Sequence, residues 1–179
     1  MTRKVCIIRQ AIYPNDLLVR REAETLCQAG FETHVICLKR LDADAPKQLE
    51  ETINGVHVHH LPLSRKKTSM LRYLFDYLSF TLMAGDKVTR LHFKRHLDII
   101  QVNNMPDLLV FSTLIPKLMG TKVIAMMYEP TPEIWEDLRK THPPLIVGAV
   151  QRGALNFVDL LFTVTQQMKD VFVSRGISP

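Results

Sequence analysis

The stretch DIIQVNNMPDLLVFSTLIPKLMGTKVIAMMYEPTPE, residues 98–133, contains two short apolar runs with a helical pattern between them. Residues 98–102 and 123–127 are typical of buried strands, because three of five residues in the first and all five in the second are apolar. Residues 107–119 have helical spacing and are followed by Gly120, a favoured helix-ending residue. This order predicts two parallel strands joined by a helical crossover.

The rest of the chain repeats this alternation. Further strands are predicted at 4–8, 34–38, 56–61 and 160–164, and further helices at 16–29, 70–96, 145–157 and 166–175. The predicted fold is therefore a doubly wound, Rossmann-like α/β domain, with helices on both faces of a parallel sheet. For residues 40–54 two possibilities stay open, a short strand or no regular structure.

Length and composition indicate one globular domain spanning residues 1–179. Hydrophobic residues make up 46% of the chain and charged residues 23%, which is ordinary for such a domain. No apolar run is long enough for a signal peptide or a membrane span, so we expect a cytoplasmic protein. The three cysteines lack metal-ligand spacing and are interpreted as small buried hydrophobic residues.

The positive charge is concentrated in one segment. Residues 65–97 contain eight Lys or Arg and two Asp, a balance of +6 in a chain whose formal net charge is +5. Residues 70–83 are apolar at ten of fourteen positions, and Arg72, Asp76 and Ser79 form a narrow polar stripe at helical spacing. We favour a core helix whose last turns carry cations that suit its dipole. The alternative is peripheral attachment of residues 65–97 to the inner face of an anionic membrane.

Several functional classes lack their motifs in this sequence. There is no phosphate-binding P-loop, no G-x-G-x-x-G after the first strand and no G-x-S-x-G elbow. The basic segment carries no helix-turn-helix or aromatic RNA-binding pattern, so nucleic acid is not an expected partner. Asp42 and Asp44 have a spacing that can hold a cation, but a solvated loop is the favoured interpretation. His57 and His59 are interpreted as partly exposed strand residues, and no metal site or cofactor is expected.

Polar and rigid residues follow three of the predicted strands. Open α/β sheets bind ligands beyond the carboxyl ends of their strands, so AIYPND (11–16), NNMPD (103–107) and YEPTPE (128–133) are predicted to border a site. The candidate substrate-binding residues are Tyr13, Asn15, Asn103, Asn104, Tyr128 and Glu129. Turn and cap chemistry explains the two asparagines equally well. Glu133 can equally be structural, since it is placed to begin a helix, where the dipole favours a carboxylate.

Residues 98–133 resemble the N-terminal domain of the family 4 retaining glycosyltransferases. The similarity lies in the order strand, polar pair with Met-Pro, helix, G-x-K-V, strand and an acid-x-x-P-E turn, and it extends to YPNDLLVRREAETLCQAGFETHVICL (13–38) and to residues 72–104. Where the family often has histidine, this chain has Tyr128, Gln101 and Asn103, so no catalytic residue is assigned. The glycines often found after the first strand are missing from AIYPND.

The resemblance implies one half of a two-domain GT-B enzyme. Such an enzyme transfers a sugar from a nucleotide sugar to a hydroxyl of a sugar or lipid-linked acceptor, with retention and without a metal, in polysaccharide or glycoconjugate synthesis. The implied role of residues 1–179 is the acceptor side, and the donor-binding C-terminal domain, with its E-x7-E motif, is absent from this chain. The isolated domain is then expected to be inactive. A stand-alone binding or scaffold module docking on a membrane or protein partner is the alternative.

Overall fold

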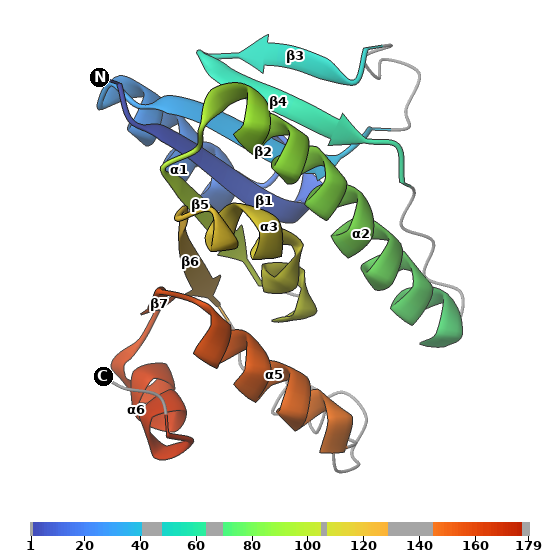
Figure 1. Ribbon diagram of the computed structural model, residues 1–179, viewed down its shortest axis with the longest axis vertical. Coiled ribbons are helices and arrows are strands. Elements are labelled where there is room, and N and C mark those ends of the chain that lie inside the picture. The colour runs from blue at the N-terminus through green and yellow to red at the C-terminus, as the bar shows by residue number, and fades with distance from the viewer. Residues whose placement is uncertain (1, 41–47, 64–69, 105–106, 129–144, 177–179) are drawn as a thin grey trace.

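Seven strands of the described residues form a single sheet that helices flank in the computed structural model (Figure 1). The structure describes residues 2–40, 48–63, 70–104, 107–128 and 145–176. The strands are β1 (Lys4–Ile12), β2 (Glu32–Leu38), β3 (Glu50–Ile53), β4 (Val56–Leu61), β5 (Ile99–Asn103), β6 (Lys122–Met127) and β7 (Leu160–Thr163). The helices are α1 (Leu17–Gln28), α2 (Met70–Arg95), the 3-10 helix η1 (Asp107–Thr113), α3 (Leu114–Leu118), α5 (Leu145–Phe157) and α6 (Gln166–Ser174).

The strand order is β3-β4-β2-β1-β5-β6-β7. All neighbours pair in parallel except β3, which runs antiparallel to β4 at the edge of the sheet. This arrangement confirms the predicted Rossmann-like α/β class, and β3 settles the open question about residues 40–54 with a short strand. The sheet is mixed rather than purely parallel, because the two-residue turn at Asn54 and Gly55 can only join antiparallel neighbours.

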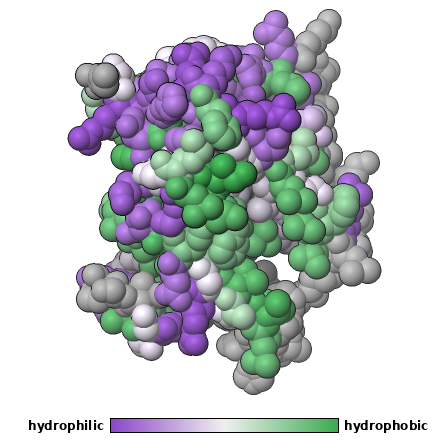
Figure 2. Space-filling model, in the orientation of Figure 1, coloured by the Kyte–Doolittle hydropathy of each residue, from purple (hydrophilic) through white to green (hydrophobic). Residues whose placement is uncertain are grey.

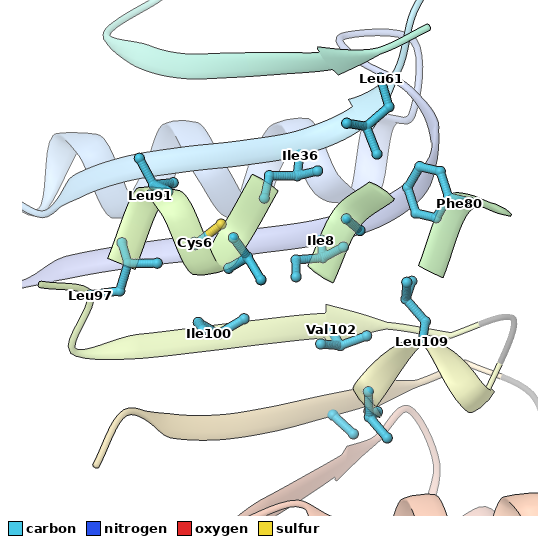
Figure 3. Packing of buried hydrophobic residues seen from close by; sticks show 14 of the residues in the cluster. Cys6, Ile8, Ile36, Leu61, Phe80, Leu91, Leu97, Ile100, Val102 and Leu109 are labelled. Atoms are coloured by element: carbon cyan, nitrogen blue, oxygen red, sulfur yellow. The ribbon is translucent and has the colours of Figure 1, made fainter. Parts of the chain in front are cut away.

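The larger hydrophobic core lies between the sheet and α2, η1 and α5 (Figure 3). Ile8, Ile36 and Ile100 are fully buried side chains from three adjacent strands, and their register places them on one face. On α2, Phe80 and Leu91 are among the buried residues that pack against them. We call this side of the sheet the α2 face.

The opposite side, the α1 face, has a smaller core. Ile7, Val35 and Val58 pack against Val19 and Ala23, which lie one turn apart on α1. Asp16 fixes the start of that helix, because its Oδ1 accepts hydrogen bonds from the backbone N–H groups of Leu18 and Val19. α1 therefore begins shortly after the carboxyl end of β1. Its second turn lies beside β5.

The helix predicted over 107–119 is divided in two. Residues 107–113 form the 3-10 helix η1 and only residues 114–118 form an α-helix. Pro116 lacks the N–H that an α-helix would use at that position, and the Thr113 hydroxyl donates to the carbonyl of Val110 at 2.7 Å. Both features interrupt the regular ladder of i to i−4 hydrogen bonds.

The polar stripe predicted for the start of α2 is only partly exposed to solvent, because Arg72 is exposed whereas Asp76 is buried. Asp76 is buried and pairs with Arg72 at 3.1 Å, while its backbone carbonyl accepts a hydrogen bond from Gln10. By contrast, Leu74 is 58% exposed and Leu78 is 50% exposed. The favoured interpretation of α2 as a core helix is therefore correct for one side only. Across the residues that the structure describes, no helix has the length and apolarity needed to cross a bilayer.

Candidate functional site

The candidate site lies where the strand order reverses. From β1 the chain builds outward through β2 and β4 on one side, and from β5 through β6 and β7 on the other. In open α/β sheets this divergence leaves a crevice at the carboxyl ends of the two central strands, here β1 and β5. Side chains from β1, α1, β5 and the residue after β6 meet there on the α1 face, and we call them the edge cluster: Arg9, Asp16, Glu22, Gln101, Asn103 and Tyr128.

Glu22, in the second turn of α1, is the centre of the edge cluster. Its Oε2 accepts hydrogen bonds from Gln101 Nε2 at 2.8 Å and from Asn103 Nδ2 at 3.1 Å. Its Oε1 accepts one from the Tyr128 hydroxyl at 3.3 Å, and Asn103 also donates to that hydroxyl at 2.9 Å. Gln101 pairs with Ile7 in the sheet, so Gln101 and Asn103 both point to the α1 face and can reach the helix.

Arg9 and Asp16 form the second part of the edge cluster. Arg9 Nε lies 3.1 Å from Asp16 Oδ2, and the Arg9 guanidinium lies 5.3 Å from the centre of the Tyr128 ring. Asp16 thus uses one oxygen to cap α1 and the other to hold Arg9. A carboxylate already satisfies the first-turn N–H groups of α1, so this helix end offers no vacant place for a phosphate. The absence of glycine from AIYPND agrees with this, because glycines after the first strand are what lets the backbone approach a diphosphate closely.

Burial raises the pKa of Tyr128 well above its usual value, and the nearby Glu22 carboxylate raises it further. The phenol is therefore protonated at neutral pH and available as a hydrogen-bond donor. Tyr128 is only half-buried, as is Glu22. Together with Arg9 and Asp16, these side chains present hydroxyl, carboxylate and guanidinium groups at one sheet edge, a set that suits a ligand rich in hydroxyl groups.

The structure brings three of the predicted site residues together, namely Asn103, Asn104 and Tyr128. Asn103 and Asn104 are both buried, with their amides directed into the protein. Asn104 Oδ1 accepts a hydrogen bond from the backbone N–H of Tyr128 at 2.9 Å, and so ties the ends of β5 and β6 to each other. In the structure the two asparagines hold Tyr128 and Glu22 in place, whereas Tyr128 itself reaches the surface.

Tyr13 does not lie on the exposed edge where the sequence pattern predicted it. Its side chain is 1% exposed and packs in the core beneath α1 with Val19 and Cys37. Burial and then the nearby Glu24 raise its pKa to about 12. The pairing of β1 with β2 becomes irregular between Ile8 and Ile12, just before Tyr13, and a sequence pattern does not reveal this irregularity. Asn15 is exposed, as expected for a loop residue.

The remaining predicted positions lie outside the described residues: Glu129, Glu133, Asp42 and Asp44. Within the described ranges, no three or more His, Cys, Asp or Glu side chains gather in a way that could hold a metal ion. His59 is buried rather than partly exposed, since α2 covers the strand face that carries it.

Glu22 and Arg9 were not among the predicted site residues, although each leaves a signal in the sequence. Glu22 falls between Val19 and Ala23, on the helix face whose other residues are apolar. Arg9 interrupts a strand of buried residues. A charge at an inward position is unusual unless it has a partner, and here both charges do.

Residues 18–179 match the family model described as a glycosyl transferase 4-like domain. The chain belongs to this family. The predicted membership in the family 4 glycosyltransferases is thereby confirmed, and the edge cluster lies in a glycosyl transferase 4-like domain. A comparison with curated protein sequences gave no match.

The fold is also found among solved structures. Sucrose-phosphate synthase from Thermosynechococcus elongatus matches with a TM-score of 0.68 at 13% sequence identity. The match covers 98% of this chain and 45% of that chain, so this chain spans less than half the length of the synthase. At such low identity the likeness establishes the fold, that of one Rossmann-like half of a GT-B enzyme.

Proposed function

We propose that this domain is the acceptor-side, N-terminal half of a retaining glycosyltransferase. The enzyme transfers a sugar from a nucleotide sugar to a hydroxyl of a sugar or lipid-linked acceptor in polysaccharide or glycoconjugate synthesis, and it requires no metal. The observation that carries this proposal is the position of the edge cluster, with hydrogen-bonding groups at the reversal of strand order in a domain of this family. In this proposal the protein acts in the cytoplasm.

Each group in the edge cluster has a distinct part in holding an acceptor. The Glu22 carboxylate accepts a hydrogen bond from an acceptor hydroxyl, and the Tyr128 phenol donates one. Arg9 holds the Tyr128 ring and Asp16 in place. Asn103 and Gln101 are positioning residues, because their amides donate hydrogen bonds from β5 that orient the Glu22 carboxylate. Asn15, Glu129 and Glu133 remain candidate acceptor contacts in this proposal.

The donor side requires groups beyond those of the edge cluster. A retaining transfer needs stabilisation of the leaving diphosphate, and the N-terminus of α1 is capped by Asp16 rather than open to an anion. We therefore expect the nucleotide sugar to bind mainly to a second domain. We also expect residues 1–179 alone to transfer no sugar.

The test uses the full-length protein that contains this domain, with a panel of nucleotide sugars and of sugar and lipid acceptors. NMR of the product gives the anomeric configuration, and retention is expected. Glu22→Gln keeps the shape of the side chain but removes the charged acceptor, so kcat/KM for the acceptor is expected to fall about 10- to 100-fold. The donor KM is expected to change little.

The matched control is Glu24→Gln, the same substitution two residues along α1. Glu24 accepts a hydrogen bond from Asn54 at 2.9 Å, away from the edge cluster. An equal loss in the two variants would contradict the role of Glu22, and an inverted product would contradict retention. Absence of any transfer by the full-length protein would favour the alternative, a binding or scaffold module.

A further inference from the structure

Gln151 is a buried polar residue on a mainly apolar helix. α5 begins with three hydrophobic residues, 145–147, and Figure 2 shows hydrophobic residues on its visible side there. Three residues of α5 are buried, Gln151, Ala154 and Leu155, and the first is the only polar one among them. Gln151 is 2% exposed. Burying an amide costs free energy unless its donor and its acceptor are paired, so the partners of Gln151 indicate its role.

Both ends of the Gln151 side chain are paired, and together they link α6 to η1. The amide nitrogen Nε2 donates a hydrogen bond to Asp107 Oδ2 at 3.3 Å, and the amide oxygen accepts one from Arg175 Nη1 at 2.6 Å. Arg175 is the C-cap of α6, and Asp107 is the first residue of η1. A guanidinium donor makes the second bond the stronger one. We call these three side chains the α5 bridge.

The α5 bridge ends beside the residue that holds Tyr128. Asp107 follows Asn104 by three residues, and both are buried. The two side chains line one cavity of about 10 Å³ that also borders Met127. Asn104 Oδ1 accepts the hydrogen bond from the backbone N–H of Tyr128 at 2.9 Å. A cavity of this size admits at most a single water, so these groups position the end of β6 and do not touch a substrate.

An apolar contact from the same two helices reaches the end of β6. Met127, the residue before Tyr128, is 2% exposed and packs against Leu155 of α5 and Phe172 of α6. Both helices lie beside the β6 and β7 end of the sheet (Figure 1). Phe172 precedes Arg175 by three residues, so about one turn of α6 supplies both the apolar contact and the guanidinium of the α5 bridge. The place of Tyr128 therefore depends on how α5 and α6 are held.

We propose that Gln151 and Arg175 are positioning residues for the acceptor site. Through the segment that follows β5, they hold the backbone of Tyr128 at the place from which its hydroxyl reaches Glu22 at 3.3 Å. Loss of the α5 bridge lets the end of β6 shift, and a small displacement of a binding group slows a reaction that depends on orientation. The proposal rests on the proposed function, since it takes the edge cluster as the acceptor site.

The first measurement is hydrogen exchange at the Tyr128 amide of the full-length protein, followed by NMR with isotope-labelled tyrosine. Tyr128→Phe identifies the signal. Gln151→Leu keeps a similar volume but makes neither hydrogen bond of the α5 bridge, and this amide is expected to exchange about tenfold faster in that variant.

A second variant, Arg175→Leu, keeps the test open if Gln151→Leu does not fold, because Arg175 is only half-buried. Its Tyr128 amide is expected to exchange about threefold faster than that of the native protein. Since the two residues act through one bridge, the double variant should exchange no faster than Gln151→Leu alone.

The second measurement is steady-state kinetics of the same variants. In Gln151→Leu, kcat/KM for the acceptor is expected to fall about 3- to 10-fold, whereas the donor KM changes little. The matched control is Gln166→Leu, the same substitution on α6, where the exposed Gln166 donates to Asp170 of its own helix at 2.9 Å. The control is expected to leave the exchange at Tyr128 and the kinetics unchanged.

The two measurements separate this proposal from the proposed function. Native exchange at the Tyr128 amide in both bridge variants, or equal acceleration in Gln166→Leu, would overturn the positioning role whatever the kinetics show. Faster exchange with an unchanged kcat/KM for the acceptor would overturn it as well. Faster exchange in a full-length protein that transfers no sugar would confirm the coupling to Tyr128 and contradict the proposed function.

Discussion

Two polar clusters lie on this sheet, at opposite ends of the strands and on opposite faces. The edge cluster, centred on Glu22, borders the carboxyl ends of β1 and β5 on the α1 face. The second, which we call the histidine cluster, lies near the amino ends of β2 and β4 on the α2 face. It consists of His34, His57 and His59 with the neighbouring charges Glu32, Glu50 and Lys87.

The two clusters keep their charges in different ways. In the edge cluster each charged side chain has a hydrogen-bonding partner, Glu22 with three donors and Arg9 with Asp16. In the histidine cluster, His34 Nδ1 lies 3.2 Å from His59 Nε2 and both rings are buried, so burial lowers the pKa of each. The edge cluster is therefore suited to binding, and the histidine cluster makes folding depend on pH.

The largest expected effect is on the pH dependence of folding. Burial, then Lys87 and His34, lower the pKa of His59 from 6.5 to about 4. The unfolded chain therefore binds more protons than the folded chain between these values, so stability is complete above about pH 6.5 and falls as the pH is lowered toward about 4. Urea unfolding is expected to show a loss of about 2 kcal/mol between about pH 7.5 and about pH 5.

The variant His59→Gln should remove most of this loss, since glutamine does not titrate. The control is His96→Asn, because His96 is exposed and its φ of 55° is one that asparagine tolerates. The same pH dependence in His59→Gln and in the native chain would contradict the assignment to His59.

A smaller effect is expected from Asn103→Leu in the edge cluster. The substitution removes the hydrogen bonds that the Asn103 amide donates to Glu22 and to the Tyr128 hydroxyl, which costs about 1–3 kcal/mol of unfolding free energy. Unlike the effect of His59, this cost should be the same at about pH 7.5 and about pH 5.5. Asn15→Ala, at an exposed position, should change stability by less than about 0.5 kcal/mol. A strongly pH-dependent cost for Asn103→Leu would remove the contrast between the clusters.

The smallest effect is a change in the titration of His59. Lys87 lowers the pKa of His59 and forms a hydrogen-bonded ion pair with Glu50. In Lys87→Met the pKa of His59, followed by NMR of the imidazole, should rise toward its usual value. Arg90→Met is the control, since the exposed Arg90 pairs with Asp86 on its own helix. If neither variant moved the titration, burial and the neighbouring His34 would account for the low pKa.

The spacing of apolar residues predicted most of the helices and strands, because in these elements the apolar residues are the ones that face the core. β4 and α5 have the predicted bounds, and the Rossmann-like class follows from the alternation of strands and helices. The prediction missed the division of 107–119 into η1 and α3, because the periodicity of apolar residues does not distinguish a 3-10 from an α-helix. It also missed the antiparallel direction of β3, which depends on the turn at Asn54 and Gly55.

The sequence by itself determined the fold class and the family resemblance, because these depend on the order of elements. From the same order it predicted a site at the carboxyl ends of the strands. Only the tertiary structure decided which side chains meet there. Glu22 joins Asn103 and Tyr128 across 81 and 106 residues of sequence, and Tyr13 is buried beneath α1. The structure also decided that leucines of α2 face outward while Asp76 faces the sheet. Such contacts depend on strand register and helix rotation, which long-range packing fixes and local sequence does not.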